Sequence, residues 1–167
     1  LLLAESRFPS DIYRDSLRRY CDFFKDFAEN YHSETDLGGW FIPDYWHEGM
    51  SSVSHTSLNH QLAEILFLYR ASDVLAEGSL SALADRMLLA VDETGEDWVL
   101  PDGNLHYQVS QDGEYGNTAY PYLTYDDLFK LQKYLSDRFS RTDPVLDLLM
   151  QHKRAWMDAN GITAYMK

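Results

Sequence analysis

The connections between the apolar segments of this chain alternate between long and short. This alternation constrains the fold more than any other feature of the sequence. The long connections, residues 32–53 and 94–123, alternate with short ones at Gly78–Ser79 and at residues 140–142. Antiparallel neighbouring helices place alternate connections at the same end. We therefore expect both long connections to lie together at one end. Connections of this length are uncommon in compact domains and are often functional.

Apolar residues recur at steps of three and four between the connections, as in the first segment at Ile12, Tyr13 and Leu17. This period is typical of amphipathic helices. From Trp98 to Val109, two short apolar runs surround a Pro-Asp-Gly-Asn turn, which predicts a β-hairpin. The sequence therefore predicts a mainly α fold of antiparallel helical hairpins with one short β-hairpin. The expected helices run from about Ser10 to Tyr31, Ser54 to Glu77, Gly78 to Val91, Thr124 to Leu135 and from Asp143 onward.

Three of the expected helices carry capping signals at their first residues. Ser10 is a natural N-cap for the first helix. Thr124 and Asp127 resemble a capping box with Asp in place of Glu or Gln. Asp126 and Asp127 also sit favourably against the helix dipole, so we expect a capping role for both. Pro144 fits the first helical position of the last helix.

Composition and charge fit one globular domain spanning residues 1–167. The net charge of −13 disfavours nucleic acid and anionic membrane surfaces as partners. No apolar stretch approaches the roughly 20 residues that a membrane helix needs, so we expect no membrane insertion. The single Cys21 excludes an internal disulfide and is expected to be a small buried residue. Because the run Leu1–Leu3 resembles the end of a helix, we expect the chain to be a fragment of a longer protein.

Both long connections are rich in aromatic and acidic residues, which a solvated connector would not carry. The first contains the segment Asp44–Glu48, the densest mixture of stacking and titratable groups in the chain. Burial against Trp46 is expected to raise the pKa of a neighbouring carboxyl group toward the range of a general acid. The alternative is that this segment plugs the end of the helical core. In the expected hairpin, His106 and Tyr107 are neighbours on one strand and point to opposite sides, so they cannot both face the same cleft.

His55 and Asn59 are four residues apart, so they share one face of the expected second helix. Near the helix N-terminus, a ligand oxygen could meet both side chains and the free main-chain amides. The alternative is that they cap the helix and bind loop carbonyls. His60 is five residues from His55 and is expected to point elsewhere. No Cys or carboxylate cluster completes a metal site, so we expect neither a metal nor another cofactor.

Helical pairs with long loops at one end resemble the (α/α) toroid superfamily of carbohydrate-active domains. Within it, the runs Ser54–Leu62 and Tyr120–Thr124 look most similar to the C-terminal domain of D-glucuronyl C5-epimerases. The resemblance implies a partial toroid and reversible proton abstraction beside a uronate carboxylate. Tyr and carboxylate groups would exchange acid and base roles, for which Tyr120, Tyr122 and Glu114 are candidates. Arg and Lys, which could neutralise a uronate, are scarce in both long connections.

These observations favour a carbohydrate-active domain that binds or processes an oligosaccharide or polysaccharide where the two loops meet. Hydrolysis, epimerisation and elimination all stay open. The alternative is a noncatalytic helical module that binds the remainder of the parent chain or a partner subunit through the aromatic rim. The expected catalytic residues are Asp44, His55, Glu114 and Tyr120. The expected substrate-binding residues are Tyr45, Trp46, Asn59, His106, Tyr107, Tyr115 and Tyr122.

Overall fold

A computed structural model describes residues 2–7 and 10–163 and shows a mainly helical chain with two small antiparallel sheets. The expected helix end at Leu1 lies outside the described residues. The helices are α1 (Leu2–Arg7), α2 (Asp11–Tyr31), α3 (Leu58–Leu75), α4 (Gly78–Thr94), the 3-10 turn η1 (Gly95–Trp98), α5 (Leu123–Phe139) and α6 (Pro144–Ala159). The strands are β1 (Ser33–Glu34), β2 (Trp40–Phe41), β3 (Thr56–Ser57), β4 (His106–Val109) and β5 (Tyr115–Thr118). None of the described helices is long and apolar enough to cross a membrane.

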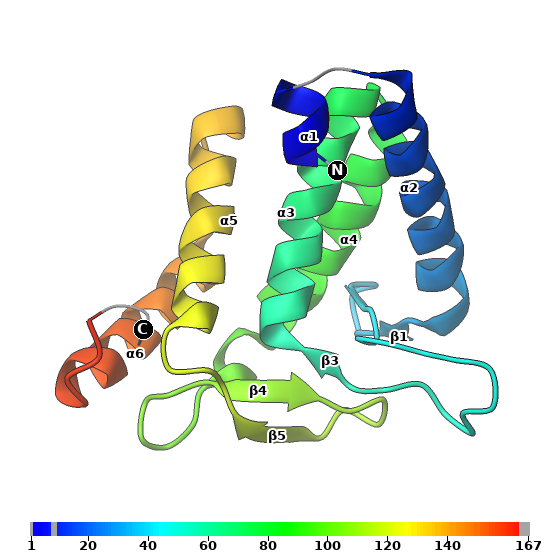
Figure 1. The fold of residues 1–167 in the computed structure, drawn as a ribbon. Coiled ribbons are helices and arrows are strands. Elements are labelled where there is room, and N and C mark those ends of the chain that lie inside the picture. The colour runs from blue at the N-terminus through cyan, green and yellow to red at the C-terminus, as the bar shows by residue number, and fades with distance from the viewer. Residues whose placement is uncertain (1, 8–9, 164–167) are drawn as a thin grey trace.

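The helices α2, α3, α4 and α5 stand side by side, and the strands gather at one end of them (Figure 1). Both long connections, residues 32–57 and 95–122 in the structure, lie at this end. The short turns after α3 and α5 lie at the opposite end, as the alternating connection lengths predict. The mainly α fold with a short β-hairpin is therefore confirmed.

The helix α3 is the centre of the core and packs against both α4 and α5. Its residues Leu58, Leu62, Ile65 and Leu68 are fully buried. The helix α2 buries only part of the apolar set that its period indicates. It buries Leu17, Cys21, Phe24 and Ala28, while Ile12 is 75% exposed and Phe23 is 62% exposed. Small residues such as Cys21 and Ala28 let the helix approach its neighbours, and several aromatic rings stay at the surface.

Two of the three capping signals mark the observed helix starts, and the third does not. Ser10 caps α2 by accepting a hydrogen bond from Tyr13 N, and Asp143 caps α6 by accepting from Val145 N and Leu146 N. The expected capping box at Thr124 is wrong, because Tyr122 is the N-cap of α5 and Thr124 already lies inside the helix. The helix α3 begins at Leu58 and not at Ser54, because the residues before it pair as strand β3.

The hairpin forms later in the chain than the sequence predicts. The tight turn is present, since Leu100 N donates to Asn104 O at 2.8 Å and Val99 bridges Leu105. Trp98, however, ends η1 and is fully buried in the core. The regular hairpin is β4–β5, and β4 also pairs with β3 on its other side. A further small sheet, β1–β2, lies in the first long connection.

A buried lysine ties the second long connection to α6. Lys153 is fully buried, and its Nζ lies 2.5 Å from Asn104 Oδ1 and 4.7 Å from the centre of the Trp156 ring. Burial lowers the pKa of Lys153 to about 8. Trp156 Nε1 in turn donates to Asp102 Oδ2 at 3.2 Å. These contacts therefore attach the turn before β4 to α6.

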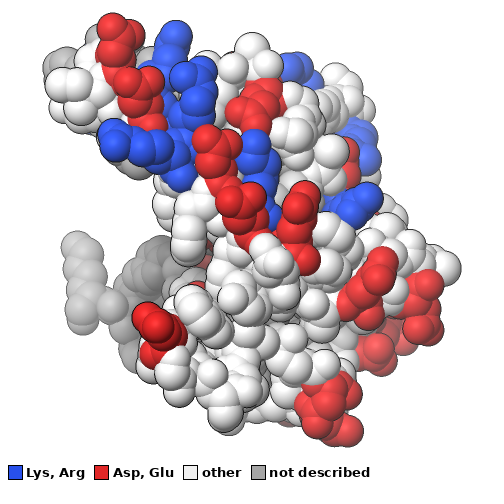
Figure 2. Space-filling model, turned by 90° about the vertical axis from the view of Figure 1, so that its right-hand side faces the viewer, with Lys and Arg blue, Asp and Glu red and all other residues white. Residues whose placement is uncertain are grey.

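Charge is distributed unevenly between the two ends of the molecule. On the face that includes α2, the Lys and Arg side chains gather toward the end with the short turns (Figure 2). Toward the loop end, the same face carries only Asp and Glu among its charged residues (Figure 2). Neither long connection contains a Lys or an Arg. The loop end therefore presents negative charge and aromatic surface with little positive charge nearby.

Candidate functional site

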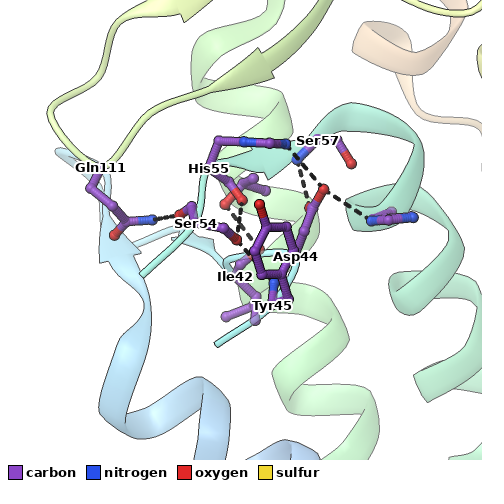
Figure 3. Close-up of polar contacts among 9 residues, drawn as sticks. Ile42, Asp44, Tyr45, Ser54, His55, Ser57 and Gln111 are labelled. Carbon is purple, nitrogen blue, oxygen red and sulfur yellow. Dashed lines mark hydrogen bonds and ion pairs between the residues drawn. The ribbon is translucent and has the colours of Figure 1, made fainter. Parts of the chain in front are cut away.

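The two long connections are joined by hydrogen bonds at the loop end. Thr56 and Ser57 in β3 pair with Val109 and Gln108 in β4. Gln111 Nε2 also donates to the main-chain oxygen of Ser54 at 3.0 Å (Figure 3). These contacts confirm that the two connections meet, and they fix the residues just before α3.

Gln61 fastens the first connection to the helical core. Its Nε2 donates to Trp40 O at 2.7 Å and to Met87 O at 3.0 Å, and its Oε1 accepts from Ile42 N at 3.3 Å. The Gln61 side chain therefore holds the segment before Asp44 against α3 and α4. Gly39 packs closely as well, because a Cβ there would lie 2.3 Å from Ala90 N.

Asp44 is a buried carboxylate at the centre of this end, with its side chain only 3% exposed. Its Oδ1 accepts from Ser57 N at 2.8 Å (Figure 3). Its Oδ2 lies 3.0 Å from His60 Nδ1 and 3.4 Å from His55 Nε2. The main chain supports this arrangement, since Asp44 N donates to His55 O at 2.9 Å. One carboxylate therefore orients two imidazole rings.

This arrangement favours one tautomer of the His60 ring. At 3.0 Å from Asp44 Oδ2, Nδ1 is the ring nitrogen that faces the carboxylate, and a carboxylate favours a proton on that nitrogen because it can only accept hydrogen bonds. The other ring nitrogen, Nε2, is then free to exchange a proton with a ligand while the ring is neutral. The His60 side chain is 58% exposed and lines the pocket described below. A buried carboxylate and an oriented imidazole form an acid–base pair.

The placement of the histidines corrects the sequence analysis. His55 precedes β3 and α3, so His55 and Asn59 do not share a helical face. His60, which was expected to point elsewhere, reaches the same Asp44 oxygen as His55. The expected helical spacing fails because the chain is extended through Thr56 and Ser57.

Aromatic residues from both connections surround His55. The Tyr45 ring meets His55 edge-on at 6.4 Å, and the Tyr107 ring meets it at 5.7 Å. Tyr120 then packs edge-on against Tyr107 at 5.5 Å. Burial is the largest of the causes that raise the pKa of Tyr107, and the Asp44 charge adds to it. The structure therefore brings Asp44, His55 and Tyr120 into one cluster, as the sequence analysis expected.

A pocket of about 280 Å³ opens on the His60 side of Asp44. We call it the aromatic pocket. Phe23 and Phe27 from α2 form one wall, and Trp46 closes it by stacking on Tyr31 with ring centres 5.3 Å apart. Polar groups meet at the base, where Asp44 and the α3 side chains reach the pocket. The full lining is Tyr20, Phe23, Phe24, Phe27, Ile42, Pro43, Asp44, Tyr45, Trp46, His60, Gln61, Glu64 and Met87.

Two more carboxyl groups lie near His60, and burial raises the pKa of both. Glu64 is one helical turn after His60 and lines the pocket; burial is the main cause that raises its pKa. Tyr20 donates a hydrogen bond to Glu64 Oε1 at 3.2 Å. Burial raises the pKa of Asp127 to about 6, against the attraction of Lys130 and His60. The expected capping role of Asp127 is wrong, because Tyr122 is the N-cap of α5 and Asp127 lies past the first turn.

Other expected site residues lie apart from the aromatic pocket. His106 and Tyr115 pack together at 5.8 Å, and Tyr115 meets the buried Trp98, so His106 and Tyr107 do face different ways. Glu114 belongs to the β4–β5 turn, where its main-chain groups bond to Ser110. Tyr122 caps α5 and Asn59 is 5% exposed. These residues extend around the loop end without lining the aromatic pocket.

A larger hollow of about 700 Å³ lies beside Tyr115, between the β1–β2 turn and the β4–β5 turn. We call it the acidic hollow, because five carboxyl groups line it. It contains no histidine, and all of its carboxyl residues except Glu93 are exposed. Its acidic residues are Glu34, Asp36, Glu93, Asp97 and Asp112.

Glu64 was not identified as a site residue from the sequence, and His60 was expected to point elsewhere. The two residues are four apart, so they share one face of a helix. Within the described residues, no group of three His, Cys, Asp or Glu side chains could hold a metal ion. No protein-family model, curated protein sequence or solved structure matches this chain. A proposal for the function must therefore start from the geometry of the loop end.

Proposed function

We propose that the chain binds a carbohydrate in the aromatic pocket and processes it by proton transfer at His60. The observation that supports this best is an aromatic-walled pocket whose base holds a carboxylate-oriented histidine. Small-molecule sites combine apolar walls with a few placed polar groups. A sugar ring suits both, because its C–H faces pack on aromatic rings and its hydroxyls bind carboxylates and imidazoles. The volume of about 280 Å³ is close to the lower limit of such sites, which fits a single sugar unit.

The proposed chemistry follows from the roles of three side chains. Asp44 holds His60 by Nδ1 and stabilises the imidazolium that forms when Nε2 takes a proton. Glu64 lies one helical turn from His60 and contacts the ligand, and the His60 imidazolium itself returns the proton at a later step. Hydrolysis, epimerisation and elimination each need such an acid and base. The product distinguishes them: new reducing ends, an inverted carbon, or an unsaturated ring.

We propose further that the helical hairpins belong to an (α/α) toroid, which the alternating connections support. In that arrangement Tyr107 and Tyr120 would extend the site on the His55 side of Asp44. Tyr120 is 49% exposed and could contact a second sugar unit. The uronate chemistry of the epimerase resemblance would need a cation, and no described residue lining the pocket is a Lys or an Arg.

Trp46→Ala tests the carbohydrate proposal, because Trp46 is a pocket wall that is 41% exposed. Losing one stacking ring should weaken oligosaccharide binding by about tenfold, or about 1.4 kcal/mol. Phe129→Ala is the matched control, since Phe129 is 47% exposed on α5 and does not line the pocket. Calorimetry with a panel of neutral and amino oligosaccharides measures both variants. Equal affinity of Trp46→Ala and the unmodified protein for every sugar that binds would contradict the proposal.

Noncatalytic partner binding is a second candidate, which the exposed apolar face of α2 favours. Ile12 and Phe23 are about three helical turns apart, so they lie on the same side of α2. Phe23 lines the pocket, whereas Ile12 does not. The carbohydrate proposal predicts weaker sugar binding for Phe23→Ser and unchanged binding for Ile12→Ser. If no sugar binds, and Ile12→Ser alone abolishes self-association measured by sedimentation, the interaction module is favoured.

A further inference from the structure

We infer that the sugar in the aromatic pocket carries a protonated amine, as an amino sugar does; this inference rests on the proposed function. The first support is charge. The described lining holds two carboxyl groups, Asp44 and Glu64, and neither Lys nor Arg. The loop end around it is likewise acidic on the face toward α2 (Figure 2). An ammonium group is attracted to this lining, whereas a sugar carboxylate is repelled by it.

The walls provide the second support, because they resemble a cage for a cation. Aromatic rings attract an ammonium group through their negative faces. The rings of Phe23, Phe27, Tyr31 and Trp46 follow one another with neighbouring centres 6.0, 5.2 and 5.3 Å apart. Phe23, Phe27 and Trp46 line the pocket together with the two carboxyl groups, and Tyr31, which does not line it, contacts both Phe27 and Trp46. A neutral sugar would use such a wall for packing only, but an amino sugar gains the electrostatic attraction as well.

The third support is a carboxyl oxygen of Glu64 that receives no hydrogen bond from the described residues. Its Oε1 accepts from Tyr20, but its Oε2 is buried without a hydrogen-bond partner among the described residues. Asp44 differs, because Ser57 N contacts its Oδ1 and the two histidines contact its Oδ2. A buried carboxylate oxygen without a donor is costly. An ammonium group supplies both the donor and the opposite charge, so Glu64 is the group that the amine contacts.

The inference has a consequence for the ionisation of Glu64. Burial raises the pKa of its carboxyl group, which favours the protonated form in the free protein. A bound ammonium group favours the carboxylate instead, so ligand binding should lower this pKa. Binding of an amino sugar should therefore release a proton, whereas binding of its N-acetylated counterpart should not.

Calorimetry with three trisaccharides tests the inference: a β-1,4-glucosamine trimer, its fully N-acetylated form and a galacturonate trimer. At about pH 6.5 the amine is protonated, because such amines titrate near the α-amino range of about 7.7–8.0. We expect the glucosamine trimer to bind at least about tenfold more tightly than the N-acetylated trimer. The galacturonate trimer should bind most weakly. At about pH 9, where the amine is neutral, the preference should disappear.

Glu64→Gln should reduce the preference for the amine to below about threefold and leave the affinity for the N-acetylated trimer within about twofold. Asp15→Asn is the matched control, because Asp15 is an exposed α2 carboxylate outside the pocket and its loss changes net charge equally. An equal effect of both variants would overturn the inference, since attraction would then depend only on net charge. Equal binding of all three sugars, or tighter binding of the galacturonate trimer, would overturn it too. Failure of every sugar to bind would instead overturn the proposed function.

Discussion

The aromatic pocket and the acidic hollow lie at the same end of the molecule and both contain carboxyl groups, but their carboxyl groups differ in environment. The hollow is larger, at about 700 Å³ against about 280 Å³. Four of its five carboxyl residues are exposed. In the pocket, by contrast, the Asp44 side chain is 3% exposed and burial raises the pKa of Glu64. Chemistry depends on perturbed and oriented groups, so the smaller site is the better candidate.

The largest effect we expect is on the free energy of unfolding, when a carboxyl group in each region is replaced by an amide. Asp44→Asn removes a buried negative charge that accepts a hydrogen bond from Ser57 N and lies within 3.4 Å of both His55 and His60. We expect the free energy of unfolding to fall by about 3 kcal/mol. Asp97→Asn in the acidic hollow is the control and should change it by less than about 0.5 kcal/mol, because Asp97 is exposed. Urea unfolding measures both; similar losses for the two variants would contradict the central role of Asp44.

The pKa shifts of Glu64 in the aromatic pocket and of Asp112 in the acidic hollow should have opposite signs. Glu64, which faces Tyr20 from α2 and His60 on its own helix, has a pKa raised chiefly by burial. The Ser110 hydroxyl lowers the pKa of Asp112 in the acidic hollow. The contribution of Glu64 to stability is therefore present at low pH and lost as pH rises through its raised pKa. That of Asp112 is present above its ordinary pKa and lost as pH falls.

Carboxyl carbon NMR measures these two titrations directly. Glu64 should titrate above the ordinary value for Glu, and Asp112 should titrate below the ordinary value for Asp. Glu64→Gln should reduce the loss of stability as pH rises, to which the raised pKa values of Asp92 and Asp127 also contribute, and Asp112→Asn should leave that loss unchanged. The comparison fails if both groups titrate at their ordinary values.

The fold was more predictable than the site because helical periods and caps are local signals. Ser10 and Pro144 marked helix starts correctly, and the alternating connections placed the loop end. The start of α3 was misplaced because the pairing of Thr56 with Val109 joins residues far apart in the sequence. Such non-local pairing overrides a local helical pattern, and no propensity reveals it.

The same limit explains what was found and missed at the site. Asp44, Tyr45 and Trp46 were identified because aromatic and acidic residues are unusual together in a connection. Glu64 was missed because a Glu on a helix is most often solvated, and its burial depends on how α2 packs. The periodic pattern that begins at Ile12 and Tyr13 identified α2 but did not fix its rotation, so it could not predict that Ile12 is exposed.

The indole N–H signals of the four tryptophans offer the most direct test of where a sugar binds. Trp46 lines the aromatic pocket, Trp98 is buried beside Tyr115, and Trp156 contacts Lys153. Titration with the glucosamine trimer, followed by two-dimensional NMR, should shift the Trp46 signal strongly and leave the signals of Trp98 and Trp156 in place. A shift at Trp98 without one at Trp46, or no shift at a saturating sugar concentration, would contradict binding in the aromatic pocket.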